Sequence, residues 1–222
     1  MEAVDVGVSV GVEPAMYTLY GSQGSGSAAV EVALERTGAP FRLVRASSWE
    51  PDSALDELAR INPLRQIPAL VLPDGGVLTE SAAILIHLGL EFPQARILPD
   101  AASRRAQAIR GLVFIAANCY SAVSVTDFPE RWTADVDDRA LERVRRAARE
   151  RLHLHWDVFA DQFEPLLDAE QPGGLEFLAA VVSKWSGTRP HLREHRPHFL
   201  ATLERIEQHP AVAPVFARHW PR

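Results

Sequence analysis

Cysteine is almost absent from this chain of 222 residues, in which Cys119 stands alone. A single cysteine cannot form an intramolecular disulfide framework or supply a Cys-x-x-Cys redox pair. Metal-ligand spacing is missing as well, because His153 and His155 are two residues apart on an expected helix and do not share a face. We therefore expect no metal site and no redox chemistry of a protein thiol.

Basic charge is also in short supply. The 23 Lys and Arg residues are outnumbered by 29 Asp and Glu residues, which gives a formal net charge of −6. The arginine-rich run 143–151 is flanked by Glu142 and interrupted by Glu150, a pattern typical of a solvated helix face. Without a basic surface for phosphate groups, we expect no nucleic-acid partner.

Segments for secretion or membrane insertion are expected to be absent too. Glu2 and Asp5 stand where a secretory signal carries basic residues before an apolar core. The longest apolar stretch, residues 112–125, contains Asn118 and two serines and is predicted to be too polar to cross a bilayer. With 47% hydrophobic residues the chain can still bury a sizeable core, so we expect a cytoplasmic protein of one or two domains.

Residues 61–90 are the most informative part of the chain. Asp74-Gly75 lies between two apolar runs and predicts a hairpin turn, because glycine tolerates the positive φ that such turns need. Pro68 cannot donate to a strand ladder, so Ile67-Pro68 is expected at the start or edge of the first strand. A cis bond there would turn the backbone N–H and C=O of Ile67 outward, toward a ligand.

The second run of the hairpin passes through Glu80-Ser81 directly into a helical pattern. Ser81, or Thr79, is the expected N-cap, and the free N–H groups of the first turn attract a carboxylate. An extended peptide-like ligand could therefore bond the Ile67 backbone at one end and the start of this helix at the other.

The order of the elements predicts the fold class. The expected order is a strand at 16–20, a Gly/Ser turn, a helix at 28–37, a strand at 41–46, a short helix within 49–60, then the hairpin and its helix. This β-α-β-α-β-β-α order predicts an α/β N-terminal thioredoxin-like domain over residues 16–93. Residues 1–15 are expected to be a flexible leader.

Beyond a linker that contains Pro99, every periodic segment is helical. The expected helices cover residues 103–126, capped by Ser103, 137–163, started by the aspartates at 135, 137 and 138, then 175–185 and 198–208. These segments predict an all-α C-terminal domain over residues 103–222.

Three motifs, in this order and spacing, resemble the glutathione-binding half of the glutathione S-transferase family. They are Asn62-Pro63-x-x-Gln66-Ile67-Pro68-Ala69-Leu70, Asp74-Gly75 and Leu78-Thr79-Glu80-Ser81. A small α/β domain followed by an all-helical domain is that family's architecture too, so the resemblance covers about residues 16–220. It implies the glutathione S-transferase fold, glutathione as co-substrate, no metal, and a homodimer.

The resemblance assigns roles to the residues of these motifs. Glu80 would face the α-amino end of glutathione, and Ser81 would face its γ-glutamyl carboxylate. Gln66 and Arg65 flank the Ile67 backbone site, and Arg65 either meets the glycyl carboxylate or is a solvated surface charge.

Further contacts are implied outside the motifs. Trp49 lies where relatives sometimes contact glutathione, with packing over a helix end as the alternative. The second substrate of this family sits against the first helices of the helical domain, which makes Phe114, Asn118, Tyr120 and Ser121 candidates. Three of them, Phe114, Asn118 and Ser121, are at helical spacing on one side.

The loop 21–27 lies where this family places the group that activates the glutathione sulfur. A hydroxyl or N–H that donates to the sulfur favours thiolate over thiol and lowers the pKa of the thiol. The thiolate can then attack an electrophile. Tyrosine-type members use a Tyr of the first strand, for which Tyr17 or Tyr20 could be proposed.

The same loop departs from the family pattern at two positions. Gly26 stands where beta-type members have the cysteine of a Cys-Ser pair, and Gly24 falls on the hydroxyl position of several serine-type relatives. The remaining candidates are Ser25, then Ser22, and finally Ser27, which could instead be the N-cap of the following helix.

The expected activity is that of a bacterial-type, serine-dependent glutathione transferase, which conjugates glutathione to a small hydrophobic electrophile in detoxification. The two glycines leave open a transferase-fold protein that has lost catalysis and serves in binding or regulation. A glutathione-dependent lyase or isomerase would use the same residues and is a third alternative.

Overall fold

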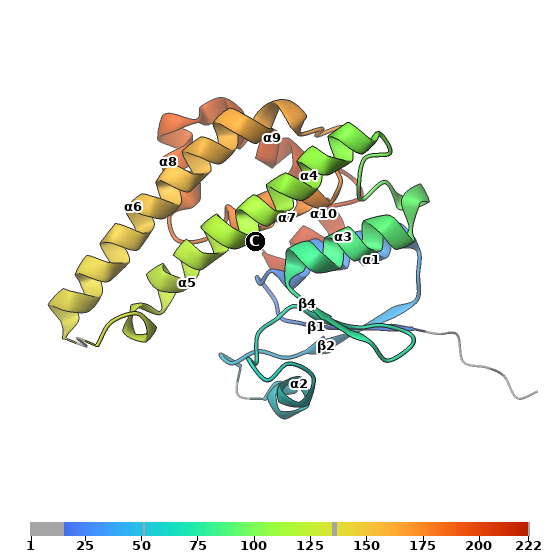
Figure 1. Ribbon diagram of the computed structural model, residues 1–222, viewed down its shortest axis with the longest axis horizontal. Helices are drawn as coiled ribbons and strands as arrows, with labels where there is room; N and C mark the ends of the chain where they lie inside the picture. The colour runs from blue at the N-terminus through green and yellow to red at the C-terminus, as the bar shows by residue number, and fades with distance from the viewer. Residues whose placement is uncertain (1–15, 51, 135–136, 222) are drawn as a thin grey trace, which may run out of the picture.

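The computed structural model describes residues 16–50, 52–134 and 137–221, so the expected leader lies outside the described residues (Figure 1). A four-stranded sheet in the order β2-β1-β3-β4 forms the N-terminal half. Its strands are β1 (Tyr17–Gly21), β2 (Phe41–Arg45), β3 (Ala69–Val71) and β4 (Val77–Thr79). β1 is parallel to β2 and antiparallel to β3, and β3 and β4 form the predicted hairpin.

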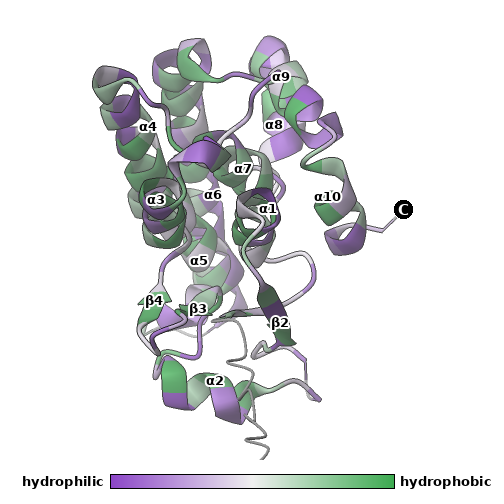
Figure 2. Cartoon of the chain, turned by 90° about the vertical axis from the view of Figure 1, so that its right-hand side faces the viewer, coloured by the Kyte–Doolittle hydropathy of each residue, from purple (hydrophilic) through white to green (hydrophobic). Residues whose placement is uncertain are grey.

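Three helices complete the predicted β-α-β-α-β-β-α order, namely α1 (Ser27–Thr37), α2 (Leu55–Ile61) and α3 (Ser81–Glu91). α1 and α3 lie on one side of the sheet and α2 on the other (Figures 1 and 2). The prediction that α1 ends at Gly38 is confirmed, since Gly38 has φ 70° and closes the helix in the left-handed conformation that glycine favours.

The rest of the chain is helical, as predicted. Its elements are η1 (Pro93–Ala95), α4 (Ala102–Phe114), the π-helical segment η2 (Ile115–Tyr120), α5 (Ser121–Asp127), η3 (Pro129–Arg131), α6 (Asp138–Phe163), η4 (Glu164–Leu166), α7 (Gly174–Val182), α8 (Thr188–His195), α9 (Pro197–Gln208) and α10 (Ala213–His219). The apolar helix α7 is buried along its whole length and packs against α1, α3, α4 and α9. It therefore joins the two halves into one core.

Two of the predicted helix starts have different outcomes. The expectation that the aspartates at 135, 137 and 138 start a helix is confirmed for Asp137, which is the N-cap of α6 and whose side chain accepts hydrogen bonds from the backbone N–H groups of Arg139 and Ala140. The expected cap at Ser103 is wrong, because α4 begins at Ala102 after Ala101 and no side chain caps it. The short helices α8 and α10 were not predicted at all.

The continuous helical stretch Ala102–Asp127 bears on the question of a membrane. It has 26 residues and a mean hydropathy of 1.5 in its most apolar window, so by length and composition it could cross a membrane. The prediction that this stretch is too polar is therefore wrong by that measure. Part of the window, 39%, is buried against other helices, and a core helix of a soluble protein passes the same test, so this is weak evidence for a span.

Candidate functional site

A cavity of about 560 Å³ opens between the sheet half and the helical half. One wall comes from the loop at 24–26, the segment 65–68 and the start of α3 at 79–82. The opposite wall comes from Tyr120 at the end of η2, from α5 and from the aromatic residues that follow it. Most of the cavity's residues therefore come from loops and element ends, which a rigid sheet and helices hold in place.

The residues predicted to bind glutathione are brought together here. Lining the cavity are Trp49, Arg65, Gln66, Ile67, Pro68, Glu80 and Ser81. Of the three candidate loop serines, Ser25 lines the cavity, whereas Ser22 and Ser27 are not among its lining residues.

The backbone of Ile67 is free for a ligand. The Ile67-Pro68 bond is cis, as the sequence allowed, and β3 begins only at Ala69. No hydrogen bond to the N–H or C=O of Ile67 is found within the described ranges. Asn62 steadies the approach to this point, because its side-chain amide donates to the carbonyl of Gln66 at 2.9 Å. An extended chain could therefore add to this edge.

The start of α3 offers uncapped N–H groups to the same cavity. The prediction that Ser81 or Thr79 is the N-cap is wrong, because Glu80 holds that position and its side chain makes no capping bond. Ser81 is instead the first helical residue. Glu80 has φ 67°, a left-handed conformation that costs a non-glycine residue about 1–3 kcal/mol and is common at ligand sites. The uncapped helix end attracts a carboxylate.

The hydroxyl groups of the loop serines are engaged within the protein. Ser25 Oγ donates to the carbonyl of Ser22 at 2.7 Å and lies 2.8 Å from Ser27 Oγ. Ser27 Oγ lies 3.2 Å from the same carbonyl, and Ser22 Oγ donates to Glu50 at 2.9 Å. Each of the three protons thus has an internal acceptor. The expectation that Ser27 is an N-cap is also wrong, since Gly26 precedes α1 in that position.

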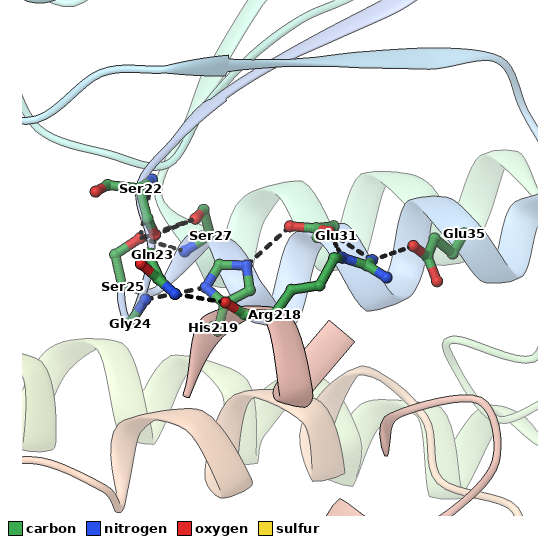
Figure 3. Close-up of polar contacts among 9 residues, drawn as sticks. All are labelled: Ser22, Gln23, Gly24, Ser25, Ser27, Glu31, Glu35, Arg218 and His219. Carbon is green, nitrogen blue, oxygen red and sulfur yellow. Dashed lines mark hydrogen bonds and ion pairs between the residues drawn. The ribbon is translucent and has the colours of Figure 1, made fainter. Parts of the chain in front are cut away.

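A buried polar network ties this loop to the C-terminal helix (Figure 3). The N–H of Gly24 donates to Nδ1 of His219 at 3.1 Å, and Nε2 of His219 lies 2.8 Å from Glu31 of α1. Because Nδ1 accepts, the imidazole proton is on Nε2 and is donated to the Glu31 carboxylate. Burial alone would raise the pKa of Glu31, but the hydrogen bonds from His219 and Arg218 outweigh it and hold the pKa below its usual range.

The hydroxyl of Tyr120 reaches the loop from the opposite wall. A Cβ atom added to Gly26 would lie 2.1 Å from the Tyr120 oxygen and 3.2 Å from Ser81 Oγ. This hydroxyl is buried and faces the side chain of Ser81, whose interaction with it lowers the pKa of Tyr120 less strongly than burial raises that pKa. Burial raises the pKa of Tyr120 to about 12. The sequence indicated Tyr120 only as a second-substrate residue, because Gly26 and Tyr120 are far apart in the chain.

Only some of the residues predicted to contact the second substrate line the cavity, and the π-helical segment is the reason. Tyr120 and Ser121 line the cavity, whereas Phe114 packs 5.6 Å from the ring of Phe163 and Asn118 donates to the carbonyl of Phe114. A π turn carries extra residues and shifts the helical phase, so regular spacing does not keep these residues on one face. The apolar wall is instead formed by Val123, Phe128, Trp132 and Trp185.

The tyrosines of the first strand point elsewhere. Tyr20 donates its hydroxyl to Glu57 at 2.5 Å, and Tyr17 is buried with its ring edge-on to Phe92 at 6.2 Å. Neither lines the cavity.

Comparisons with known proteins agree with this arrangement. Residues 27–90 match the family model described as the glutathione S-transferase N-terminal domain. The chain is 27% identical over 205 residues to the uncharacterized GST-like protein YncG of Escherichia coli (strain K12), which covers 92% of this chain and 98% of that protein.

Solved structures give the same result. A glutathione transferase homologue from Sulfitobacter with bound glutathione has a TM-score of 0.75 and 24% identity, over 90% of this chain and 97% of that one. The beta-class glutathione S-transferase of Sphingomonas chungbukensis has a TM-score of 0.70 and 26% identity, over 90% and 96%. Both likenesses extend over the sheet half and the helical half.

Proposed function

The chain belongs to the glutathione S-transferase family, and we propose that it is an enzyme that conjugates glutathione to a small hydrophobic electrophile. One observation carries the proposal: the free backbone of Ile67 and the uncapped start of α3 line the same cavity. A γ-glutamyl tripeptide has a carboxylate at one end and peptide groups in the middle, which match these two features.

In the proposed complex, the γ-glutamyl carboxylate meets Ser81 and the N–H groups of the first turn of α3. Glu80 faces the α-amino group. The central peptide groups bond the N–H and C=O of Ile67 beside Pro68, while Gln66 and Arg65 face the glycyl end. Trp49 is 57% exposed at the rim and could cover the bound tripeptide.

With both ends held, the cysteinyl side chain faces the loop at 24–26. We propose that Ser25, the candidate serine that lines the cavity, stabilises the thiolate there, with Ser22 and Ser27 supporting its hydroxyl. The thiol gives its proton to solvent. The thiolate sulfur then forms a bond to the electrophilic carbon, and the leaving group departs with the electron pair of the bond that breaks.

The electrophile is proposed to rest against the apolar wall that includes Val123, Phe128 and Trp132. These residues supply burial rather than hydrogen bonds, so a small hydrophobic molecule suits them. We further propose a cytoplasmic homodimer in which residues 16–93 and 103–222 are the two domains. Light scattering on the purified protein tests the dimer.

One observation favours a second candidate, a binding or regulatory protein without catalysis. The protons of all three loop serines already have acceptors inside the protein, so none is free to reach a thiol without a change of partner. A lyase or isomerase that regenerates glutathione would use the same cavity, and analysis of products separates it from conjugation.

The proposal is tested by incubating the protein with glutathione and a panel of aryl halides, epoxides and enals. Mass spectrometry of the products should show glutathione conjugates that form faster than in the uncatalysed control, and Ser25→Ala should slow them. Binding of glutathione without any product from the panel would support the non-catalytic candidate.

A further inference from the structure

The loop at 24–26 is held in place by residues from the C-terminal part of the chain. The backbone N–H of Gly24 donates to Nδ1 of His219 at 3.1 Å (Figure 3), and the carbonyl of Gly24 accepts the indole N–H of Trp185 at 3.2 Å. Gly24 and Ser25 line the cavity, whereas His219 is not among its lining residues. His219 therefore acts on the cavity through the backbone of Gly24 and not by touching a ligand.

Only the neutral form of the His219 imidazole can make this contact. Nδ1 accepts the Gly24 N–H, so the ring proton is on Nε2, which donates it to the Glu31 carboxylate at 2.8 Å. A second proton would go to Nδ1 and would set one N–H group against another. The bond to Glu31 would remain, because Nε2 carries a proton in both forms. Protonation of His219 therefore breaks its contact with the loop and leaves its contact with α1 intact.

The charged groups around this ring come from several elements. They are Glu31 and Glu35 of α1, Arg218 of α10, Lys184 beyond the Trp220 ring, and Glu207 of α9, which bonds Lys184. Glu31 bonds the ring directly, and Arg218 donates to the same carboxylate at 2.6 and 3.1 Å. Burial would raise the pKa of Glu31, but the hydrogen bonds from His219 and Arg218 hold that pKa below its usual range. Glu31 is therefore already ionised near neutral pH, and the histidine is the group of this pair that can take up a proton there.

We propose that His219 positions the loop at 24–26 for glutathione only while its ring is neutral, so that a proton on the ring weakens glutathione binding. This inference rests on the proposed function. When the ring takes up a proton, the Gly24 N–H loses its acceptor and faces a second donor. The loop then shifts away from α10, and Ser25 no longer faces the sulfur of the bound tripeptide. His219 is a positioning residue in this scheme, because it acts through Gly24.

Two substitutions separate the two contacts of the ring. In His219→Asn the amide oxygen lies near the place of Nδ1, so the variant keeps an acceptor for the Gly24 N–H at every pH. In His219→Gln the amide nitrogen lies near the place of Nε2, so the variant keeps a donor for Glu31 but leaves Gly24 without an acceptor. His195→Gln, at the half-exposed end of α8, is the matched control.

The ligand for the test is S-methylglutathione, which has no thiol proton. Its carboxylates and amino group keep their charges between about pH 5 and 7, so a change of affinity in this range comes from the protein. Calorimetry should give a Kd for wild type about tenfold weaker at the acid end of the range than at the neutral end, because one hydrogen bond of the loop is lost.

The variants should each abolish this pH dependence in a different way. His219→Asn should bind within about threefold of neutral wild type at both ends of the range, whereas His219→Gln should bind about tenfold more weakly at both ends. His195→Gln should follow wild type. A merely structural role of His219 would weaken binding in both variants alike. In wild type, the amide signal of Gly24 in nuclear magnetic resonance should change with the same midpoint as the Kd, which decides the question even if a variant does not fold.

The outcomes separate this inference from the proposed function. If folded wild type binds neither glutathione nor S-methylglutathione at neutral pH, the proposed function fails and the role of His219 fails with it. If wild type binds both ligands with a Kd that does not change over the range, the glutathione site stands and only the role of His219 is overturned. The same holds if His219→Asn keeps the pH dependence of wild type, or if the Gly24 signal does not follow the Kd.

Discussion

At the scale of single residues, the site depends on the absence of a side chain at Gly26. The phenol of Tyr120 fills the space of the missing side chain, and its carbon Cζ would lie 3.3 Å from a Cβ atom there. Gly26→Ala should lower the free energy of unfolding by about 1–3 kcal/mol through overpacking, and adding Tyr120→Phe should recover most of that loss. Urea unfolding of both single variants and the double variant measures this. Losses that simply add would mean that the two residues do not share the space.

Sequence reasoning found the residues whose roles are local. Ile67, Pro68 and Ser81 follow from a hairpin and a helix start that adjacent residues specify, and the structure brings them to one cavity. The meeting of Gly26 with Tyr120 could not be predicted, because it depends on how the helical half packs across the loop. The hydrogen bonds that the loop serines donate within the protein could not be predicted either, because they also depend on how the loop is packed.

At the scale of elements, helix starts were harder to predict than helices. Glu80 and Ala101 precede helices without a capping side chain, whereas the expected caps Ser81 and Ser103 lie within the first turns. Propensity identifies good cap residues, but packing decides which residue occupies the cap position. The π-helical segment η2 has no sequence signal that we recognise, yet it turns Phe114 away from the cavity.

The start of α7 keeps half of a capping box although its N-cap is a glycine. Glu176 is buried and accepts the N–H of Gly173 at 2.9 Å and the N–H of Asp168 at 3.0 Å. Glu176→Ala should destabilise the protein by about 2 kcal/mol or more, because both N–H groups lose their acceptor. Glu176→Gln keeps one acceptor oxygen and should cost less. Equal losses in the two variants, measured by urea unfolding, would contradict this account of the helix start.

At the scale of the whole molecule, the C-terminal helix α10 closes over the N-terminal loop. His219 links the N–H of the half-buried Gly24 to the Glu31 carboxylate, and both His219 and Glu31 are buried. The general division into a sheet half and a helical half could be predicted from the order of periodic segments. This long-range clamp could not, because α10 is short and its partners lie near the other end of the chain.

Removing the hydrogen bonds that His219 makes to Gly24 and Glu31 should lower both the stability of the protein and its affinity for glutathione. His219→Ala leaves the buried Glu31 carboxylate short of a partner and frees Gly24, so it should cost roughly 3 kcal/mol of unfolding free energy. Glutathione affinity should fall as well, because the loop loses its anchor. His195→Ala, on the exposed end of α8, is the matched control and should change stability by less than about 0.5 kcal/mol. A His219 variant as stable as this control would show that the network does not hold the loop.

The central claim is that the start of α3 and the Ile67 backbone form a glutathione site, and calorimetric titration tests it most directly. Wild type should bind glutathione, and Ser81→Ala should weaken binding about tenfold or more because a charge-assisted hydrogen bond to the carboxylate is lost. Ser103→Ala, on the exposed first turn of α4, should bind as wild type does. Absence of binding in folded wild type, or equal affinity in Ser81→Ala and Ser103→Ala, would contradict the account.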